Sequence, residues 1–165
     1  NVSAILLTII IVGLTNLLFT FVALLTVDRL GRRLLTLAGW AGLAVIFVAM
    51  GFCFQANITG LPVVLLVVAA IGWYASTIAP MCWVTLAEIF PNRIRGAAMA
   101  TAVFALWVGN FTLTYFFPSL LARLGAAGTF WVFAAICAVG FGIMKARLPE
   151  TKGKTLEEIE RELVD

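Results

Sequence analysis

Residues 61–96 read LPVVLLVVAAIGWYASTIAPMCWVTLAEIFPNRIRG. Residues 61–87 carry no charged side chain, and the loop that follows holds Glu88, Arg93 and Arg95. A helix rises about 1.5 Å per residue, so about 20 apolar residues cross the ~30 Å hydrocarbon core of a bilayer. The stretch therefore predicts a membrane-spanning helix that ends in a charged loop at one face of the membrane.

Other apolar runs along the chain are also long enough to cross a bilayer. They lie at approximately 2–27, 34–54, 97–121 and 129–146. The segments between the runs are short, and short connections place consecutive helices antiparallel. We therefore predict an all-α membrane protein, with five antiparallel transmembrane helices in residues 1–146 and a polar tail in residues 147–165.

The composition supports a lipid environment and excludes several classes of function. Of the 165 residues, 63% are hydrophobic and 12% are charged, whereas soluble domains carry about 25% charged residues. The chain has no His, and its three Cys residues all lie in apolar runs. We therefore expect no metal site, no cofactor and no catalytic triad, so the protein is not an enzyme. The basic residues form no binding face, which excludes nucleic acid as a partner.

Basic residues gather on one side of the predicted bundle. The loops after the first and third helices and the segment after the fifth hold ten of the eleven Lys and Arg residues, and Arg123 lies on the other side. Because short cytoplasmic loops are enriched in Lys and Arg, the tail is predicted to be cytoplasmic and residue 1 to lie outside. An external N-terminus without a signal peptide indicates that earlier helices of the same protein are missing.

Polar and aromatic side chains inside the spans are candidates for a binding site. An unpartnered amide in hydrocarbon costs several kcal/mol, so Asn16 and Asn110 should face the protein interior. Each could bind a ligand or a neighbouring helix. Trp83 and Trp107 lie deep in their spans, where an indole ring could stack on a sugar or simply pack. Pro80 should break its helix, and such a break either lines a cavity or is a packing kink.

The charged loops admit two interpretations. Asp28-Arg29-Leu30-Gly31-Arg32-Arg33 closes the first helix, where Gly31 can take the positive φ of a tight turn. Glu88 ends an apolar run, where an unpaired carboxylate would be costly, and an Arg from the neighbouring loop is its expected partner. The charges either set the topology alone or form a salt-bridge cluster that breaks in another conformation.

These loops, with the tail, resemble three signatures of the sugar porter family of the major facilitator superfamily. The tail signature is Pro149-Glu150-Thr151-Lys152-Gly153-Lys154-Thr155-Leu156-Glu157-Glu158-Ile159. The three motifs occur in the family's order and between the corresponding helices. The resemblance covers essentially the whole chain and matches the last five of the family's twelve helices. It implies that the chain is part of a larger transporter of the plasma membrane.

The resemblance also implies roles for individual residues. Family members line their central sugar site with residues that correspond to Asn16, Tyr74, Trp83 and Trp107, to which we add Asn110. Their cytoplasmic charge cluster corresponds to Arg32, Glu88 and Arg95, with Asp28 in the same motif; it closes in the outward-facing state. The tail residues Pro149, Glu150, Thr151, Lys152 and Gly153 would pack beneath the bundle and help hold that state.

The chain departs from the family pattern at two positions. Leu106 stands where hexose and pentose carriers often have Gln or Asn, and Ala79 stands where Gly usually precedes Pro80. Transport of a monosaccharide by alternating access is the leading hypothesis, with membrane lipid and the missing helices as partners. A polyol, cyclitol or organic acid as cargo, a non-transporting sugar sensor, and an inactive truncated fragment are the alternatives. The titrating carboxylate of proton-coupled members lies in the family's first helix, so symport cannot be read from these residues.

Overall fold

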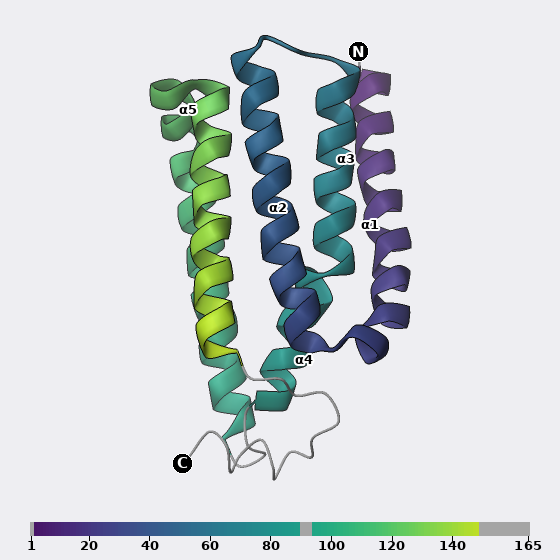
Figure 1. The fold of residues 1–165 in the computed structure, drawn as a ribbon, viewed down its shortest axis with the longest axis vertical. Coiled ribbons are helices and arrows are strands. Elements are labelled where there is room, and N and C mark those ends of the chain that lie inside the picture. Colours follow the sequence, from purple (N-terminus) through teal and green to yellow (C-terminus); the bar gives the residue numbers. More distant parts are fainter. Residues whose placement is uncertain (1, 90–93, 149–165) are drawn as a thin grey trace.

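The computed structural model describes residues 2–89 and 94–148, with side chains except those of residues 2–5, 8, 28, 29 and 87–89. Within these ranges every regular element is an α-helix (Figure 1). The helices are α1 (Val2–Leu30), α2 (Arg32–Gln55), α3 (Leu61–Ser76), α4 (Ile78–Ile89) and α5 (Arg95–Arg147). α1, α2, the α3–α4 pair and α5 are each long and apolar enough to cross a membrane.

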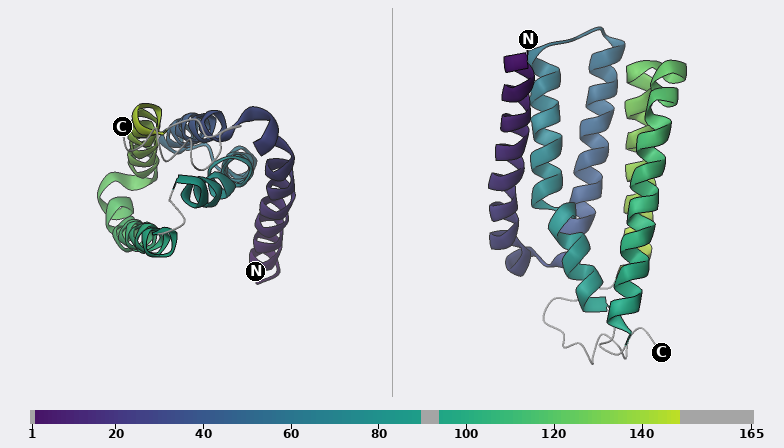
Figure 2. Two further views of the ribbon diagram at one scale, coloured as in Figure 1. Left: turned by 90° about the horizontal axis from the view of Figure 1, so that it is seen from below. Right: turned by 180° about the vertical axis from the view of Figure 1, so that it is seen from behind.

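α5 is a helical hairpin rather than one continuous rod. Gly125 has a φ of 68° and a ψ of 179°, which is not a helical conformation, and the chain reverses there. We call residues 95–124 the first arm and residues 126–147 the second arm; Figure 2 shows them side by side. The connection predicted at residues 122–128 is thus reduced to one non-helical residue. Each arm is longer than the ~20 residues that a crossing needs.

The turn at Gly125 leads to a testable prediction. A positive φ combined with a ψ near 180° is essentially restricted to glycine, and other residues are strained there by about 1–3 kcal/mol. A Cβ at this position would meet nothing within 4 Å, so the strain would come from the backbone alone. We expect Gly125→Ala to lower the melting temperature of the purified full-length protein, whereas Gly109→Ala, in open space on the first arm, does not. Equal melting temperatures would contradict the assigned turn.

α3 and α4 together form the third crossing of the membrane. The helix breaks at Thr77, the single residue between them, three residues before Pro80. Thr77 has a φ of −124° and a ψ of −78°. The break therefore differs from the one expected at Pro80, and the reason is steric. A proline ring clashes with the carbonyl four residues earlier, which here belongs to Ser76, the last residue of α3. Pro80 itself lies in the first turn of α4, where its missing N–H costs nothing.

The connection between α1 and α2 is a single residue. Gly31 has a φ of 86°, as the sequence allowed, and its N–H donates to the carbonyl of Val27 over 3.2 Å. A side chain at such a φ is disfavoured, so glycine lets α2 begin directly after α1 ends. The first charged loop is therefore built from the ends of two helices rather than from an extended segment.

α2 is the centre of the bundle, because it contacts the second arm of α5 from Arg33 to Phe54 and also packs on α3. Tryptophan rings lie directly on glycines at these contacts. The rings pack as Trp73 on Gly42, Trp131 on Gly51 and Trp40 on Gly140. Because glycine has no side chain, the helices can approach closely enough for an indole to fill the space. α1 packs on α3 at the far side.

One face of the bundle is left uncovered. Seen from below, α1 and the first arm of α5 lie at opposite ends of an arc, with α3 and α4 between them (Figure 2). Large apolar side chains on both ends are exposed; Leu25 is 75% exposed and Phe104 is 69% exposed. The elements that carry the candidate binding residues border this open arc.

Candidate functional site

The predicted substrate-binding residues lie on four different helical segments. Asn16 is on α1, Tyr74 on α3, Trp83 on α4, and Trp107 and Asn110 on the first arm of α5. All five side chains are exposed in this chain, with Tyr74 45%, Trp83 50% and Trp107 63% exposed. A site assembled from them would therefore lie at the surface of this bundle and need a further element to enclose it.

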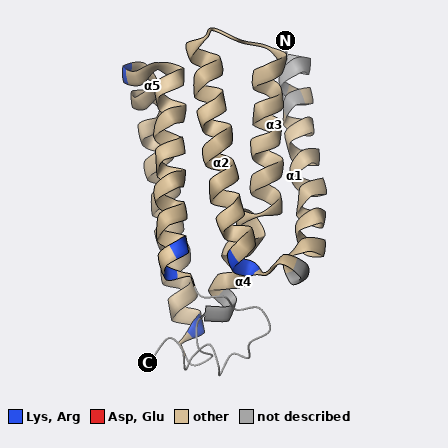
Figure 3. Cartoon of the chain, viewed as in Figure 1, with Lys and Arg blue, Asp and Glu red and all other residues tan. Residues whose placement is uncertain are grey.

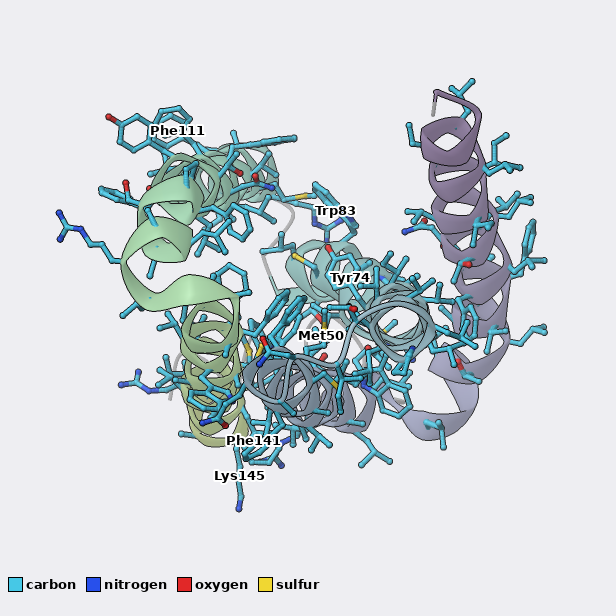
Figure 4. All side chains as sticks on the ribbon, turned by 90° about the horizontal axis from the view of Figure 1, so that it is seen from above. Met50, Tyr74, Trp83, Phe111, Phe141 and Lys145 are labelled. Atoms are coloured by element: carbon cyan, nitrogen blue, oxygen red, sulfur yellow. The ribbon has the colours of Figure 1, made fainter. Side chains whose placement is uncertain are left out.

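The helix break positions the two aromatic residues of the third crossing. Tyr74 precedes the break at Thr77 and Trp83 follows it, so a change of direction separates the two rings. Figure 4 shows Trp83 on the side of α4 that faces away from α2, with Tyr74 and Met50 nearer the middle of the bundle. Hydroxyl groups support the break. Ser76 Oγ donates to the carbonyl of Gly72 over 2.9 Å, and Thr77 Oγ1 donates to the carbonyl of Trp73.

The two amides retain hydrogen-bonding capacity. Asn110 Oδ1 accepts a long hydrogen bond of 3.4 Å from Thr114 Oγ1, one turn further along the first arm. The Asn16 side chain makes no hydrogen bond to any residue that the structure describes. Because an unsatisfied amide is costly in hydrocarbon, both side chains are suited to a polar ligand or to a polar group of another helix.

Two cavities follow one face of α2. The cavity beside α3, of about 340 Å³, is bordered by apolar side chains and Tyr74. The cavity beside α4, of about 260 Å³, includes the hydroxyls of Thr36 and Thr85. The α2 residues that line the two cavities are Thr36, Trp40, Leu43, Phe47 and Met50. Since their spacing alternates between three and four residues, they form one stripe. The two cavities lie in succession along it, between α2, the α3–α4 pair and the second arm, and we call them together the groove along α2.

Basic side chains are segregated at one end of the bundle. Figure 3 shows them at the starts of α2 and α5 and at the end of α5, with one more at the opposite turn of α5. The residues concerned are Arg32, Arg33, Arg95, Lys145 and Arg147, with Arg123 at the opposite turn. Glu88 lies in the last turn of α4, so the backbone brings this predicted gate position to the same end.

Part of the predicted charge cluster lies outside the described residues. The side chains of Asp28 and Glu88 are not described, nor are the tail residues Pro149, Glu150, Thr151, Lys152 and Gly153. Arg32 and Arg95 are described, and both are half-buried. The pairing of these charges therefore stays a prediction.

The structure also identifies residues that sequence reasoning missed. Trp73 Nε1 donates to the carbonyl of Ala38 on α2 over 3.1 Å. Arg33 Nη2 donates to the carbonyl of Lys145 at the end of α5 over 3.0 Å. Thr85 Oγ1 is buried without a hydrogen-bond partner among the described residues. The sequence offered one signal for these contacts. Arg33, Trp40 and Phe47 are seven residues apart, which places them on one face of α2.

The described part of the chain offers no cluster of side chains suited to a metal ion. No group of three or more metal-ligating side chains occurs among the described residues. What the arrangement provides is exposed amide and indole side chains on α1, α4 and the first arm, with basic side chains gathered at one end of the bundle. Amides donate and accept hydrogen bonds and an indole offers a flat apolar face with one donor, so these side chains suit a polar, uncharged ligand.

Comparisons with known proteins agree with this description. Residues 1–163 match the family described as Sugar (and other) transporter. The D-xylose-proton symporter of Escherichia coli K12 is 38% identical over 157 residues, which cover 92% of this chain and 32% of the symporter. The arabinose-proton symporter of Bacillus subtilis is 35% identical over 152 residues, covering 92% and 33% respectively.

A solved structure extends the likeness to three dimensions. The major facilitator proton:xylose symporter bound to 6-bromo-6-deoxy-D-glucose superposes with a TM-score of 0.89 at 37% identity, over 98% of this chain and 35% of that chain. The chain thus spans about a third of the length of these relatives, and its homologues are transporters rather than enzymes. The fold, the family match over residues 1–163 and the sequence identity together show that this all-α, multi-pass membrane protein belongs to the sugar porter family of the major facilitator superfamily.

Proposed function

We propose that this chain forms most of the C-terminal half of a transporter that moves a monosaccharide across the plasma membrane by alternating access. The observation that carries the proposal is the superposition on a symporter solved with a glucose analogue bound. The exposed Asn16, Trp83, Trp107 and Asn110 support it, because amides can bind sugar hydroxyls and indoles can stack on the C–H face of the ring. The substrate would lie between this bundle and the other half of the transporter.

We further propose that the groove along α2 receives a transmembrane helix that precedes residue 1. The groove runs past both α3 and α4, as a spanning helix would require. The groove is mostly apolar. At its end beside α4, the buried Thr85 hydroxyl needs a hydrogen-bond partner. A helix of the same polypeptide would fill the cavities and supply that partner. Tyr74 borders this groove and is 45% exposed.

The basic end of the bundle is proposed to face the cytoplasm. Arg32, Arg33, Arg95, Lys145 and Arg147 lie together at that end, and the positive-inside rule assigns it to the cytoplasmic side. Residue 1 then lies at the outer side. Labelling of single cysteines, introduced at Asn57 in the turn after α2 and at Ala146, with a membrane-impermeant reagent on intact cells would test this topology. Reaction at position 146 and not at position 57 would contradict it.

The transport proposal is tested by uptake. The full-length parent protein is reconstituted in proteoliposomes and assayed with labelled D-glucose and D-xylose, with and without an inward proton gradient. Saturable uptake is the expected result, and its response to the gradient separates symport from facilitated diffusion. Absence of uptake from folded protein would exclude both sugars as cargo.

A second cargo class is supported by Leu106. This residue precedes Trp107 on the first arm and is 36% exposed, but it offers no hydrogen bond where related carriers often have an amide. A site that lacks a hydrogen-bond partner for one of the substrate's hydroxyls binds that substrate poorly. A polyol, a cyclitol or an organic acid would then be preferred. Competition of unlabelled members of each class against sugar uptake distinguishes these cargoes.

The charge cluster is expected to act on the rate of transport rather than on binding. Arg32 at the start of α2 and Glu88 at the end of α4 lie at the proposed cytoplasmic end. Loss of a charged hydrogen bond costs about 1.5–3 kcal/mol, so Arg32→Ala or Glu88→Ala should slow maximal uptake by roughly tenfold or more. Sugar affinity, measured by equilibrium binding, should change much less. Equal losses in rate and affinity would contradict a gating role.

A further inference from the structure

The contact between α2 and the second arm of α5 has a regular register. On α2, Arg33, Trp40, Phe47 and Phe54 are spaced by seven residues, which places them on one side of the helix. Each meets the second arm in antiparallel order. The pairs are Arg33 with Lys145, Trp40 with Gly140, Phe47 with Phe133, and Phe54 with Phe130. The two helices are therefore joined along their whole common length.

Three of the four pairs are held by aromatic packing. The rings of Phe54 and Phe130 stack in parallel with centroids 5.3 Å apart, and Phe47 and Phe133 lie 6.0 Å apart. The Trp40 ring lies on the backbone of Gly140. None of these contacts involves a charge, so nothing in them would change when a cluster of ion pairs opens or closes.

Arg33 completes this series at the proposed cytoplasmic end with a hydrogen bond in place of a ring. Its Nη2 donates to the carbonyl of Lys145 over 3.0 Å. The last carbonyls of a helix lack partners within the helix, and this end of the helix dipole favours a cation. The next carbonyl back is satisfied within the chain, since Leu148 N–H donates to Met144 O over 2.9 Å. Arg33 thus caps the end of the second arm.

Arg32 and Arg33 are adjacent in the same motif. Consecutive residues on a helix are separated by about 100°, so the two side chains leave α2 in different directions. Arg33 reaches the end of the second arm. Its Nε is buried without a hydrogen bond to a described residue, so the bond from Nη2 is what fixes the guanidinium at the helix end.

We propose that Arg33 is a positioning residue that clamps the start of α2 to the last turn of α5, and that this clamp stays closed while the gate formed around Arg32 opens. Of the two arginines in the motif, Arg33 would then keep a constant contact, and Arg32 would belong to the contact that changes during transport. The hydrogen bond between Arg33 and Lys145 is present in this structure whatever the protein transports. The proposal that the bond stays closed during transport rests on the proposed alternating access.

The test measures the distance between spin labels in the full-length transporter, in a background without reactive native cysteines. One pair of labels, at Leu34→Cys and Ala146→Cys, reports the clamped end; both positions are exposed. A second pair, at Val45→Cys and Ala135→Cys, lies at exposed positions beside the Phe47–Phe133 contact and serves as the control.

Arg33→Met keeps the length of the side chain but removes the donor, whereas Arg33→Lys keeps a donor. We expect Arg33→Met to broaden the distance distribution of the first pair and to leave the control pair unchanged, and we expect Arg33→Lys to preserve the narrow distribution. Broadening by both substitutions would show that packing, not the hydrogen bond, fixes the distance between the two helix ends. An unchanged distribution in Arg33→Met would show that the hydrogen bond does not contribute to that distance. Either result overturns the clamp.

Persistence is tested by adding Arg32→Ala to the labelled protein. The distance at the clamped end should stay the same although the gate is disabled. A longer distance would place Arg33 in the moving contact and overturn the proposal. If Arg32→Ala leaves sugar uptake intact, the gate hypothesis fails on its own, whereas the comparison of Arg33→Met with Arg33→Lys still decides the clamp.

Discussion

Gly140→Ala is expected to destabilise the protein by about 1–3 kcal/mol, the usual cost of forcing extra volume into a packed contact. A Cβ built at Gly140 would lie 2.7 Å from the ring of Trp40, well inside van der Waals contact. Trp40 lies within the series of contacts between α2 and the second arm, so a displacement of its ring would disturb that packing. The two helices would have to separate locally. The change is measured as the melting temperature of the purified full-length transporter.

Gly142→Ala is the matched control on the same arm. A Cβ at Gly142 would meet nothing within 4 Å, and alanine is the better helix former by about 0.5–1 kcal/mol. This substitution should therefore leave the melting temperature unchanged or raise it. Equal shifts in the two variants would mean that the contact between Trp40 and Gly140 does not hold the helices together.

Trp83→Ala is expected to weaken sugar binding by about tenfold. Pairs of aromatic rings contribute about 0.5–1.5 kcal/mol beyond burial, and we expect a similar gain for a sugar ring stacked on an indole. A difference of about 1.4 kcal/mol corresponds to a factor of ten in affinity. Trp83 is half exposed on α4, so its removal leaves no void in the bundle. The apparent dissociation constant for D-xylose or D-glucose, in the full-length protein, is the quantity to measure.

Phe141→Ala provides the control for that experiment. Figure 4 shows Phe141 at the opposite side of the bundle from Trp83, close to Lys145. Its loss should lower stability without changing the affinity for sugar. An unchanged affinity in Trp83→Ala would remove this residue from the site, and a similar loss in both variants would trace the effect to stability rather than to contact with the substrate.

The sequence alone determined the architecture of this chain, because lipid imposes strict requirements on a polypeptide. Backbone groups in hydrocarbon must be satisfied within the chain, so apolar runs of about 20 residues become helices and charges are confined to their ends. This is why the all-α fold and the sharp turn at Gly31 could be predicted. The family could be predicted as well, since its signatures are contiguous in the sequence.

The tertiary structure decided where the helices break and how they join. Pro80 indicated a break, but the steric clash acts on Ser76, and the hydroxyls of Ser76 and Thr77 stabilise the chain there. The hydrogen bond between Arg33 and Lys145 joins residues that are 112 positions apart. No local pattern specifies such a contact, because it depends on how two helices pack. The candidate binding residues lie between these cases: their types were visible in the sequence, whereas the tertiary structure decided that their side chains are exposed on this bundle.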